Sequence, residues 1–204
     1  DLWMEKIKNN LQKTDAVFVS AVENKGQTGA ADPHVWLSSL LVKKQVAEIL
    51  AALKQIDEKN FSFYETNAKE LNNKLDDLDV NIRKALKNCK KRDIITSHAA
   101  FTYFAQDYGL NQIAIAGLSP DEEPSPKRLA EIAKFAQKNN VKYIFFEALV
   151  SPKFAETIAR EIGAETLVLN PIEGLSEEEV RRGKNYFTEM ENNLNNLKIA
   201  LECQ

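Results

Sequence analysis

The hydrophobic positions of the chain repeat in two different ways along its length. From residue 38 to residue 89 they recur every three or four positions, which is the spacing of one face of an α-helix. After Cys89, short apolar runs alternate with segments of helical spacing. This second pattern is typical of an α/β domain with a mainly parallel sheet. The pattern therefore predicts helices from residue 38 to residue 89 and alternating strands and helices after Cys89.

The first 57 residues carry a mixed pattern. Residues 3–11 have helical spacing, residues 16–20 form an apolar run typical of a strand, and residues 24–31 have the composition of a loop. Ser38 or Ser39 can cap a helix whose apolar positions continue to Ile56. We assign residues 1–57 to an amino-terminal α/β lobe.

One long helix is predicted to follow. Apolar residues from Phe61 to Leu86 alternate spacings of three and four, without Gly or Pro. They predict a helix of about 30 residues and roughly 45 Å. A helix of this length extends beyond one small domain, and its single short apolar seam fits a connection between lobes better than a coiled coil. We therefore assign residues 58–89 to a bridging helix and residues 90–204 to a carboxy-terminal α/β lobe.

The predicted carboxy-terminal lobe contains four strands and at least three helices. The candidate strands are residues 93–96, 112–115, 141–146 and 166–169. Ser125 and Pro126 predict the start of a helix that runs to about Asn139, and Gly163 is placed to end a helix at residues 152–162. The last helix has the apolar positions Tyr186, Met190, Leu194, Leu197 and Leu201.

Polar side chains gather at one predicted edge of this sheet. His98 follows the first strand, Glu147 closes the third, and Asn170 and Glu173 follow the fourth. Ligands of parallel sheets bind beyond the carboxyl ends of the strands. A single histidine is more often a structural residue than a ligand, but convergence on one edge favours a site. The other histidine, His34, lies just ahead of a helical pattern.

Composition narrows the possible functions. The net charge is −3 and the pI is near 5.6, without a clustered basic face, which argues against nucleic acid as a partner. No apolar run approaches the roughly 18 residues of a membrane span. Two cysteines, Cys89 and Cys203, leave both free thiols and a disulfide open. The compartment is equally open, since an export segment can be removed from a mature protein.

Five segments, together with the long predicted helix, carry a resemblance to a known family. They are Asp-Pro-His-Val-Trp-Leu at 32–37, Ser-His-Ala-Ala-Phe-Thr-Tyr-Phe-Ala-Gln-Asp-Tyr-Gly-Leu at 97–110, Gly-Leu-Ser-Pro-Asp-Glu-Glu-Pro-Ser-Pro at 117–126, Phe-Phe-Glu at 145–147 and Leu-Asn-Pro-Ile-Glu-Gly-Leu at 169–175. In this order they resemble the solute-binding proteins of zinc and manganese ABC importers. The resemblance implies two α/β lobes joined by one rigid helix, with metal held between them.

The resemblance also implies the metal ligands. The histidines of its first two segments are ligands in zinc-binding members, and they correspond to His34 and His98. Many members have an aspartate at the position of Asn170, and a neutral amide replaces a carboxylate poorly on a divalent ion. A subgroup resembling the streptococcal zinc-binding lipoproteins uses the glutamate three residues later, which corresponds to Glu173. We expect Glu147 and Asn170 to support the site without binding the ion.

The implied function is capture rather than catalysis. Two imidazoles and one carboxylate suit Zn²⁺, whereas manganese-binding relatives tend to have a carboxylate at the position of His98. We expect an extracytoplasmic bacterial protein, periplasmic or anchored as a lipoprotein, that is monomeric and delivers zinc to the membrane permease of an ABC importer. The alternatives are manganese binding or a surface adhesin. A zinc hydrolase is disfavoured, because the sequence has neither a His-Glu-x-x-His helix nor a nucleophile motif.

The resemblance is incomplete at the beginning of the chain. Family members carry a further ligand histidine upstream in the first lobe, and this sequence has only two histidines. We therefore expect that the amino-terminal lobe is incomplete here, and that zinc binds weakly or with water completing its shell. If the protein is exported, Cys89 and Cys203 could form a disulfide, because they end the bridging helix and the last helix.

Overall fold

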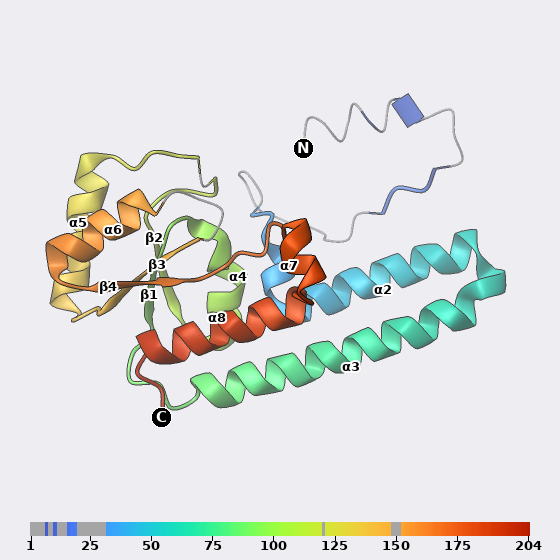
Figure 1. Ribbon diagram of the computed structural model, residues 1–204. Helices are drawn as coiled ribbons and strands as arrows, with labels where there is room; N and C mark the ends of the chain where they lie inside the picture. Colours follow the sequence, from blue (N-terminus) through green and yellow to red (C-terminus); the bar gives the residue numbers. More distant parts are fainter. Residues whose placement is uncertain (1–6, 8–9, 12–15, 20–31, 120, 148–151) are drawn as a thin grey trace. The chain divides into compact units, whose positions relative to one another are not determined.

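The computed structural model describes residues 7, 10–11, 16–19, 32–119, 121–147 and 152–204 (Figure 1). Its internal contacts divide the chain into two units. The first unit comprises Asp1–Ala31 and Ser39–Asp77, and the second comprises Asp32–Ser38 and Leu78–Gln204. The predicted helix at residues 3–11 lies mostly outside the described residues, and the predicted loop at 24–31 lies entirely outside them.

Helices make up the described part of the first unit from Ser39 onward. They are α2 (Ser39–Ile56), the 3₁₀ turn η2 (Glu58–Asn60) and the first part of α3 (Phe61–Leu86). The carboxylate of Asp57 stabilises the turn between the helices. It accepts hydrogen bonds from the side-chain amide of Asn60 and from Tyr64 Oη, the latter at 2.6 Å. Apolar residues of α2 and α3 line a shallow cleft between the two helices.

The strand predicted at residues 16–20 is wrong for the four of its residues that the structure describes. Residues 16–19 have no regular secondary structure, and Val17, Phe18 and Val19 are 50%, 42% and 40% exposed. A strand is stabilised by hydrogen bonds to a neighbouring strand and by burial of one face. Within the described residues, both sheets are formed by strands after residue 92.

The long helix predicted from the apolar spacing is present as α3, which covers 26 residues. It is three residues shorter at each end than the predicted range 58–89, because Glu58–Asn60 adopts a 3₁₀ turn and regular helix ends at Leu86. The boundary between the two units falls inside α3, after Asp77. The short segment Asp32–Ser38 belongs to the second unit.

Two pairs of parallel strands form the centre of the second unit. In the first pair, β1 (Asp93–Thr96) is in register with β2 (Asn111–Ala114). In the second pair, β3 (Tyr143–Phe146) is in register with β4 (Glu165–Val168). The pairs lie next to each other through β1 and β3. All four predicted strands are therefore present, with ends that differ from the predicted ones by at most two residues.

Helices of the second unit follow the strands in alternation. They are α4 (Thr102–Tyr108), α5 (Pro126–Lys138), α6 (Lys153–Ile162), α7 (Glu177–Arg181) and α8 (Tyr186–Ala200), with 3₁₀ turns η1 (Val35–Leu37) and η3 (Ala99–Phe101). Ser125 caps α5 as predicted, since its Oγ accepts from the Arg128 amide. Gly163 ends α6 in the left-handed conformation at φ 70°, which costs a residue without Cβ little.

The strands separate two hydrophobic cores. Ile94 of β1 and Phe145 of β3 face a core that contains apolar residues of α4, α8 and the last part of α3. Their chain neighbours Ile95 and Ile144 face the opposite core, which contains residues of α5 and α6. Successive side chains of a strand point to opposite faces. This sandwich of helices around parallel strands is the α/β fold that the sequence predicted.

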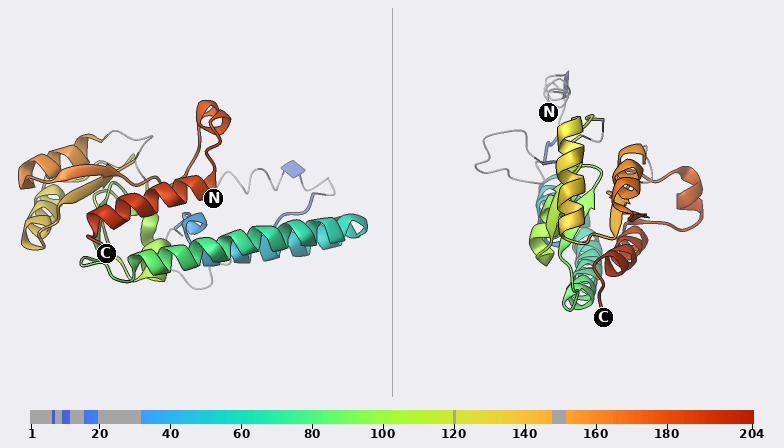
Figure 2. Two further views of the ribbon diagram at one scale, coloured as in Figure 1. Left: turned by 60° about the horizontal axis from the view of Figure 1, so that its bottom comes forward. Right: turned by 90° about the vertical axis from the view of Figure 1, so that its left-hand side faces the viewer.

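A disulfide closes the second unit. Cys89, just after α3, is bonded to Cys203, just after α8, across a separation of 114 residues. It confirms the pairing expected for an exported chain. Figures 1 and 2 show α8 beside the carboxy-terminal part of α3, and Leu197 and Leu86 belong to the same core. No helix among the described residues is long and apolar enough to cross a membrane.

Candidate metal site

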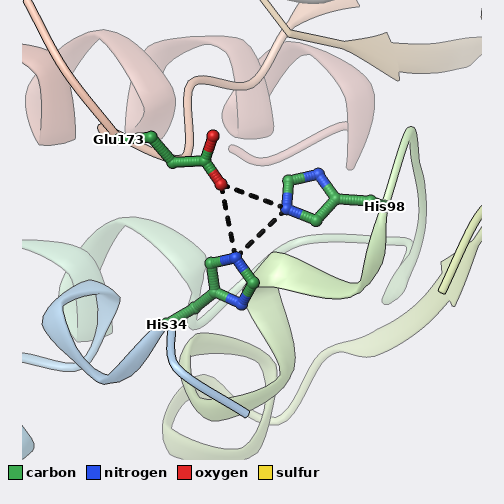
Figure 3. Close-up of side chains that lie close together, drawn as sticks. All are labelled: His34, His98 and Glu173. Carbon is green, nitrogen blue, oxygen red and sulfur yellow. Dashed lines mark hydrogen bonds and ion pairs between the residues drawn. The ribbon is translucent and has the colours of Figure 1, made fainter. Parts of the chain in front are cut away.

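Three side chains of the second unit converge on one point (Figure 3). They are His34, His98 and Glu173, whose potential ligand atoms lie within 4.8 Å of one another. The two Nε2 atoms are 3.2 Å apart. Glu173 Oε1 lies 3.4 Å from His34 Nε2 and 3.5 Å from His98 Nε2. The two imidazoles are buried, whereas the Glu173 side chain is 34% exposed, so the trio meets solvent on the carboxylate side.

His34 is fixed by the residue two positions before it. It stands at the start of η1, and its ring Nδ1 lies 2.7 Å from Asp32 Oδ1. The backbone amide of His34 donates to the same oxygen at 3.0 Å. The carboxylate of Asp32 therefore holds both the ring and the backbone. With the proton on Nδ1, the lone pair of Nε2 points toward Glu173 and His98.

His98 is held in a similar way by a more distant carboxylate. It lies two residues after the end of β1, and its Nδ1 lies 2.6 Å from Oε1 of Glu147, which follows β3. Both residues are buried. The backbone carbonyl of His98 accepts from Thr96 Oγ1 at 2.8 Å and from Gln112 Nε2 at 3.1 Å. The adjacent carboxyl ends of β1 and β3 thus bring together a histidine and a glutamate that are 49 residues apart.

Glu173 comes from the loop after β4. Asn170 in this loop is buried, and its Oδ1 accepts the backbone N–H of Ile172 at 2.9 Å. Trp36, two residues after His34, donates its indole N–H to the carbonyl of Pro171 at 2.8 Å. The Asn170 side chain is occupied by these loop contacts and by α8, and it does not join the trio.

The geometry of the trio suits a tetrahedral cation. Two imidazole lone pairs that face each other at 3.2 Å repel unless a cation or a proton shares them. A carboxylate on each Nδ1 fixes the tautomer and makes Nε2 a better donor, as is common in zinc sites. The edges of a tetrahedron built on zinc bonds of about 2.0–2.1 Å measure about 3.3–3.4 Å. The three separations of the trio lie around this length.

The charges around His34 shift its pKa. Burial alone would lower the pKa of the imidazole, but the hydrogen bond and the negative charge of Asp32, followed by those of Glu173, raise it above the ordinary 6.5. Burial also raises the pKa of Asp32, yet its hydrogen bonds to His34 outweigh this and keep the value below 3.8. The two shifts reflect one pairing, in which the carboxylate of Asp32 favours the charged form of His34 and the imidazole of His34 favours the charged form of Asp32.

The sequence argument identified the converging residues but missed several of their supports. Asp32 was part of the segment that carries the family resemblance, yet nothing in the pattern assigned it to the ring of His34. Trp36 was likewise unassigned. A carboxylate two residues before a candidate ligand was the one available signal for Asp32, because orienting carboxylates often accompany metal-bound histidines.

The chain matches a known family over almost its whole length. The model of the family described as "ZnuA: Zinc-uptake complex component A periplasmic" matches residues 1–200. The chain is 49% identical to the high-affinity zinc uptake system protein ZnuA of Bacillus subtilis over 172 residues, which cover 84% of this chain. It spans 54% of the length of that relative and a smaller share of the streptococcal relatives.

Solved structures show the same fold. The Zn(II)-bound ZnuA-like domain of Streptococcus pneumoniae AdcA is 40% identical, with a TM-score of 0.83, and the match covers 98% of this chain and 76% of that domain. The laminin-binding protein Lbp of Streptococcus pyogenes is 32% identical, with a TM-score of 0.85, over 98% of this chain and 78% of that one.

Proposed function

Since the chain belongs to the ZnuA family of zinc-uptake components, we propose that it captures zinc outside the cytoplasm and delivers it to the membrane permease of an ABC importer. The observation that carries this proposal is the trio His34, His98 and Glu173. Because the relatives matched by sequence are longer than this chain, the cargo and the permease partner are inferred for the whole protein, of which the trio supplies part of the cargo site.

We assign the three side chains of the trio as direct zinc ligands. Asp32 and Glu147 hold the rings from their Nδ1 sides, so both Nε2 atoms are available to one ion. Each imidazole must be neutral to bind, and its proton is carried by the nitrogen that faces the supporting carboxylate. Zinc is a cargo that must later be released, and a site with an exposed carboxylate offers a path for its entry and exit.

Zinc fits this donor set better than manganese. Two nitrogen donors and one carboxylate oxygen are typical of Zn²⁺, whereas Mn²⁺ prefers oxygen-rich octahedral sites. Capture also fits the surroundings better than hydrolysis. The two carboxylates nearest the rings, Asp32 and Glu147, are engaged with imidazole nitrogens, so neither is free to act as a general base on a zinc-bound water.

We propose that the chain follows the family's two-lobed plan, with residues 1–57 in an incomplete amino-terminal lobe, residues 58–89 in the connecting helix and residues 90–204 in the second lobe. A further ligand would then come from a region of the whole protein outside this sequence, and water would take its place in this chain. We also propose that the protein acts as a monomer, in the periplasm or anchored to the membrane as a lipoprotein.

The test is a zinc titration of the purified protein with a competing chelator, beside the same titration with Mn²⁺. We expect one zinc per chain and much weaker binding of manganese. Glu173→Gln keeps the shape of the side chain and removes its charge, so it should weaken zinc binding strongly. The exposed Glu191→Gln on α8 is the matched control and should leave zinc binding unchanged. Absence of zinc binding, or equal affinity for both ions, would refute the proposal.

Host attachment is the second candidate function, and the structural similarity to the laminin-binding protein Lbp favours it. A deletion strain separates the two functions. Loss of growth under zinc limitation with normal attachment supports zinc uptake. Loss of attachment at normal growth would support adhesion.

A further inference from the structure

One face of α8 carries three polar residues that contact the segments bearing two of the proposed ligands. Tyr186, Glu189 and Asn193 are spaced by three and four positions, so they lie on the same side of the helix. Glu189 and Asn193 are buried. Buried polar side chains on a core-facing helix are costly unless they are hydrogen-bonded. The hydrogen-bond partners of these three residues therefore show which segments this face of α8 holds in place.

Asn193 binds the backbone of Asn170 at two points. Its Oδ1 accepts the Asn170 N–H at 2.7 Å, and its Nδ2 donates to the Asn170 carbonyl at 2.7 Å. Such a pair of bonds mimics the pairing of a neighbouring strand. It fixes the position and the direction of the chain just after β4.

Glu189 fixes the side chain of the same residue. Its Oε2 accepts from Asn170 Nδ2 at 2.9 Å, while its Oε1 faces Lys184 Nζ at 3.4 Å. Since Asn170 Nδ2 is turned to Glu189, its Oδ1 is turned the other way, where it accepts the Ile172 N–H. The glutamate therefore selects which end of the Asn170 amide faces the loop.

The loop needs this support because its backbone is strained. Ile172 has a φ of 56°, a left-handed conformation that is unfavourable for a β-branched residue. Such conformations persist where surrounding contacts fix them. The Asn170 side chain holds the Ile172 amide, and Glu173 follows directly, directed toward the two histidines (Figure 3).

The third residue of the face contacts the His34 segment. Tyr186 Oη donates to the carbonyl of Trp36 at 2.9 Å, and the indole of Trp36 donates in turn to the Pro171 carbonyl. The segments of His34 and of Glu173 are thus joined to each other and to the same face of α8.

We propose that Glu189 and Asn193 are positioning residues for zinc capture, which act through Asn170 and the strained backbone at Ile172 to direct Glu173 toward the histidines. This proposal rests on the zinc-binding function proposed above. Neither residue touches the ion. The α8 face sets the geometry of the carboxylate ligand from a helix that itself carries no ligand.

The first test is a double-mutant cycle on zinc affinity. Asn170→Ala and Asn193→Ala should each weaken zinc binding by about 10- to 100-fold, as is typical when a residue that orients a ligand is lost. In a Glu173→Ala background the same changes should alter zinc affinity by less than about threefold, because the carboxylate through which they act is already absent. The exposed Asn195→Ala is the matched control for Asn193→Ala. Equal losses in both backgrounds would overturn the proposal.

The second test exchanges the two partners. Asn170→Asp places a carboxylate against the buried Glu189 carboxylate, so the free energy of unfolding of the zinc-free protein should fall. Adding Glu189→Gln restores an amide–carboxylate pair with reversed polarity, and most of the lost stability should return. Both variants are compared without zinc, because a carboxylate at position 170 is itself a metal donor. If the double variant is no more stable than Asn170→Asp alone, Glu189 does not act through Asn170.

The third test needs no metal, so it separates this proposal from the proposed function. In the zinc-free protein, the Ile172 amide should exchange slowly with solvent deuterium, and Asn170→Ala should accelerate that exchange at least about tenfold, as expected when a protecting hydrogen bond is lost. Unchanged exchange would refute the positioning role. Slow exchange that Asn170→Ala accelerates, together with no zinc binding by the wild type, would refute the zinc function instead.

Discussion

Each histidine of the trio uses its two ring nitrogens differently. One nitrogen of each ring faces a supporting carboxylate, Asp32 or Glu147, and the other faces the shared centre. Removal of either ring therefore removes a preorganised donor. Because His34 and His98 are buried, the replacement of one by alanine also leaves a carboxylate without its partner.

His98→Ala should weaken zinc binding more than any change to a supporting residue. We expect a loss of at least about 100-fold, because a direct ligand is lost and outer residues typically cost about 10- to 100-fold. Asn170→Ala should be milder than Glu173→Ala. Chelator competition measures the affinities, and circular dichroism checks that the fold is intact. Near-unchanged affinity of a folded His98→Ala variant would show that His98 is not a ligand.

Zinc affinity should fall on acidification, beginning above pH 6.5. The pKa of His34 is raised by Asp32 and Glu173 over the effect of burial, so protons compete with zinc at a higher pH than for a free imidazole. In the zinc-free protein, the contribution of His34 to the free energy of unfolding increases on acidification. Protonated His34 contributes stability that is fully present below about pH 6.5 and is lost as the pH rises through the raised folded-state pKa.

Titration calorimetry at several pH values measures the fall in zinc affinity. Denaturant unfolding of the zinc-free protein at the same pH values measures the change in its stability. Asp32→Asn is the informative variant, because it removes the charge that raises the pKa of His34. It should move the onset of zinc loss to lower pH. An unchanged onset would show that Asp32 does not control the imidazole.

At the scale of elements, the carboxyl ends of the strands and the helix α8 place the site. β1, β3 and β4 end next to one another and deliver His98, Glu147 and the Glu173 loop, respectively. The apolar spacing of α8 predicted its core-facing side correctly, since Met190, Leu194 and Leu197 are buried. The same spacing gave no sign that Glu189 and Asn193 are buried among them, because polar residues in an amphipathic pattern are ordinarily assigned to solvent.

The disulfide between Cys89 and Cys203 should stabilise the second unit. It closes a long loop and joins the ends of two helices, so its reduction should lower the free energy of unfolding by about 2–5 kcal/mol. Urea unfolding with and without reductant measures the difference. The double variant Cys89→Ser with Cys203→Ser is the control and should not respond to reductant. Two titratable thiols in the unfolded, unreduced protein would contradict the bond.

At the scale of the whole molecule, the trio offers three proposed ligands, and a structural zinc shell usually has four. The chain also spans 54% of the Bacillus subtilis relative. We predict that a longer form of the protein with an upstream histidine binds zinc more tightly than this chain. Calorimetry of both forms under the same conditions is the measurement. Equal, tight, one-to-one binding by both would mean that the upstream region contributes no ligand.

The sequence by itself determined most of the elements and the residue types of the proposed metal site. Apolar spacing located α3 and the four strands of the second unit, because burial of one face imposes a period on each element. The ordered segments around His34, His98 and Glu173 also indicated a metal site from the sequence alone. In contrast, the run at residues 16–20 was misassigned where the structure describes it, since strand formation depends on a partner that local sequence does not contain.

Only the tertiary structure decided how the proposed ligands are held. Asp32 and Glu147 orient the rings, and Glu189 and Asn193 fix Asn170, through contacts between residues as far as 49 positions apart. The left-handed backbone of Ile172 likewise goes against the preference of its side chain. Hydrogen-bond partners and strained dihedrals depend on which segments the fold brings together. The spacing of apolar residues along the sequence indicates only which face of each segment is buried.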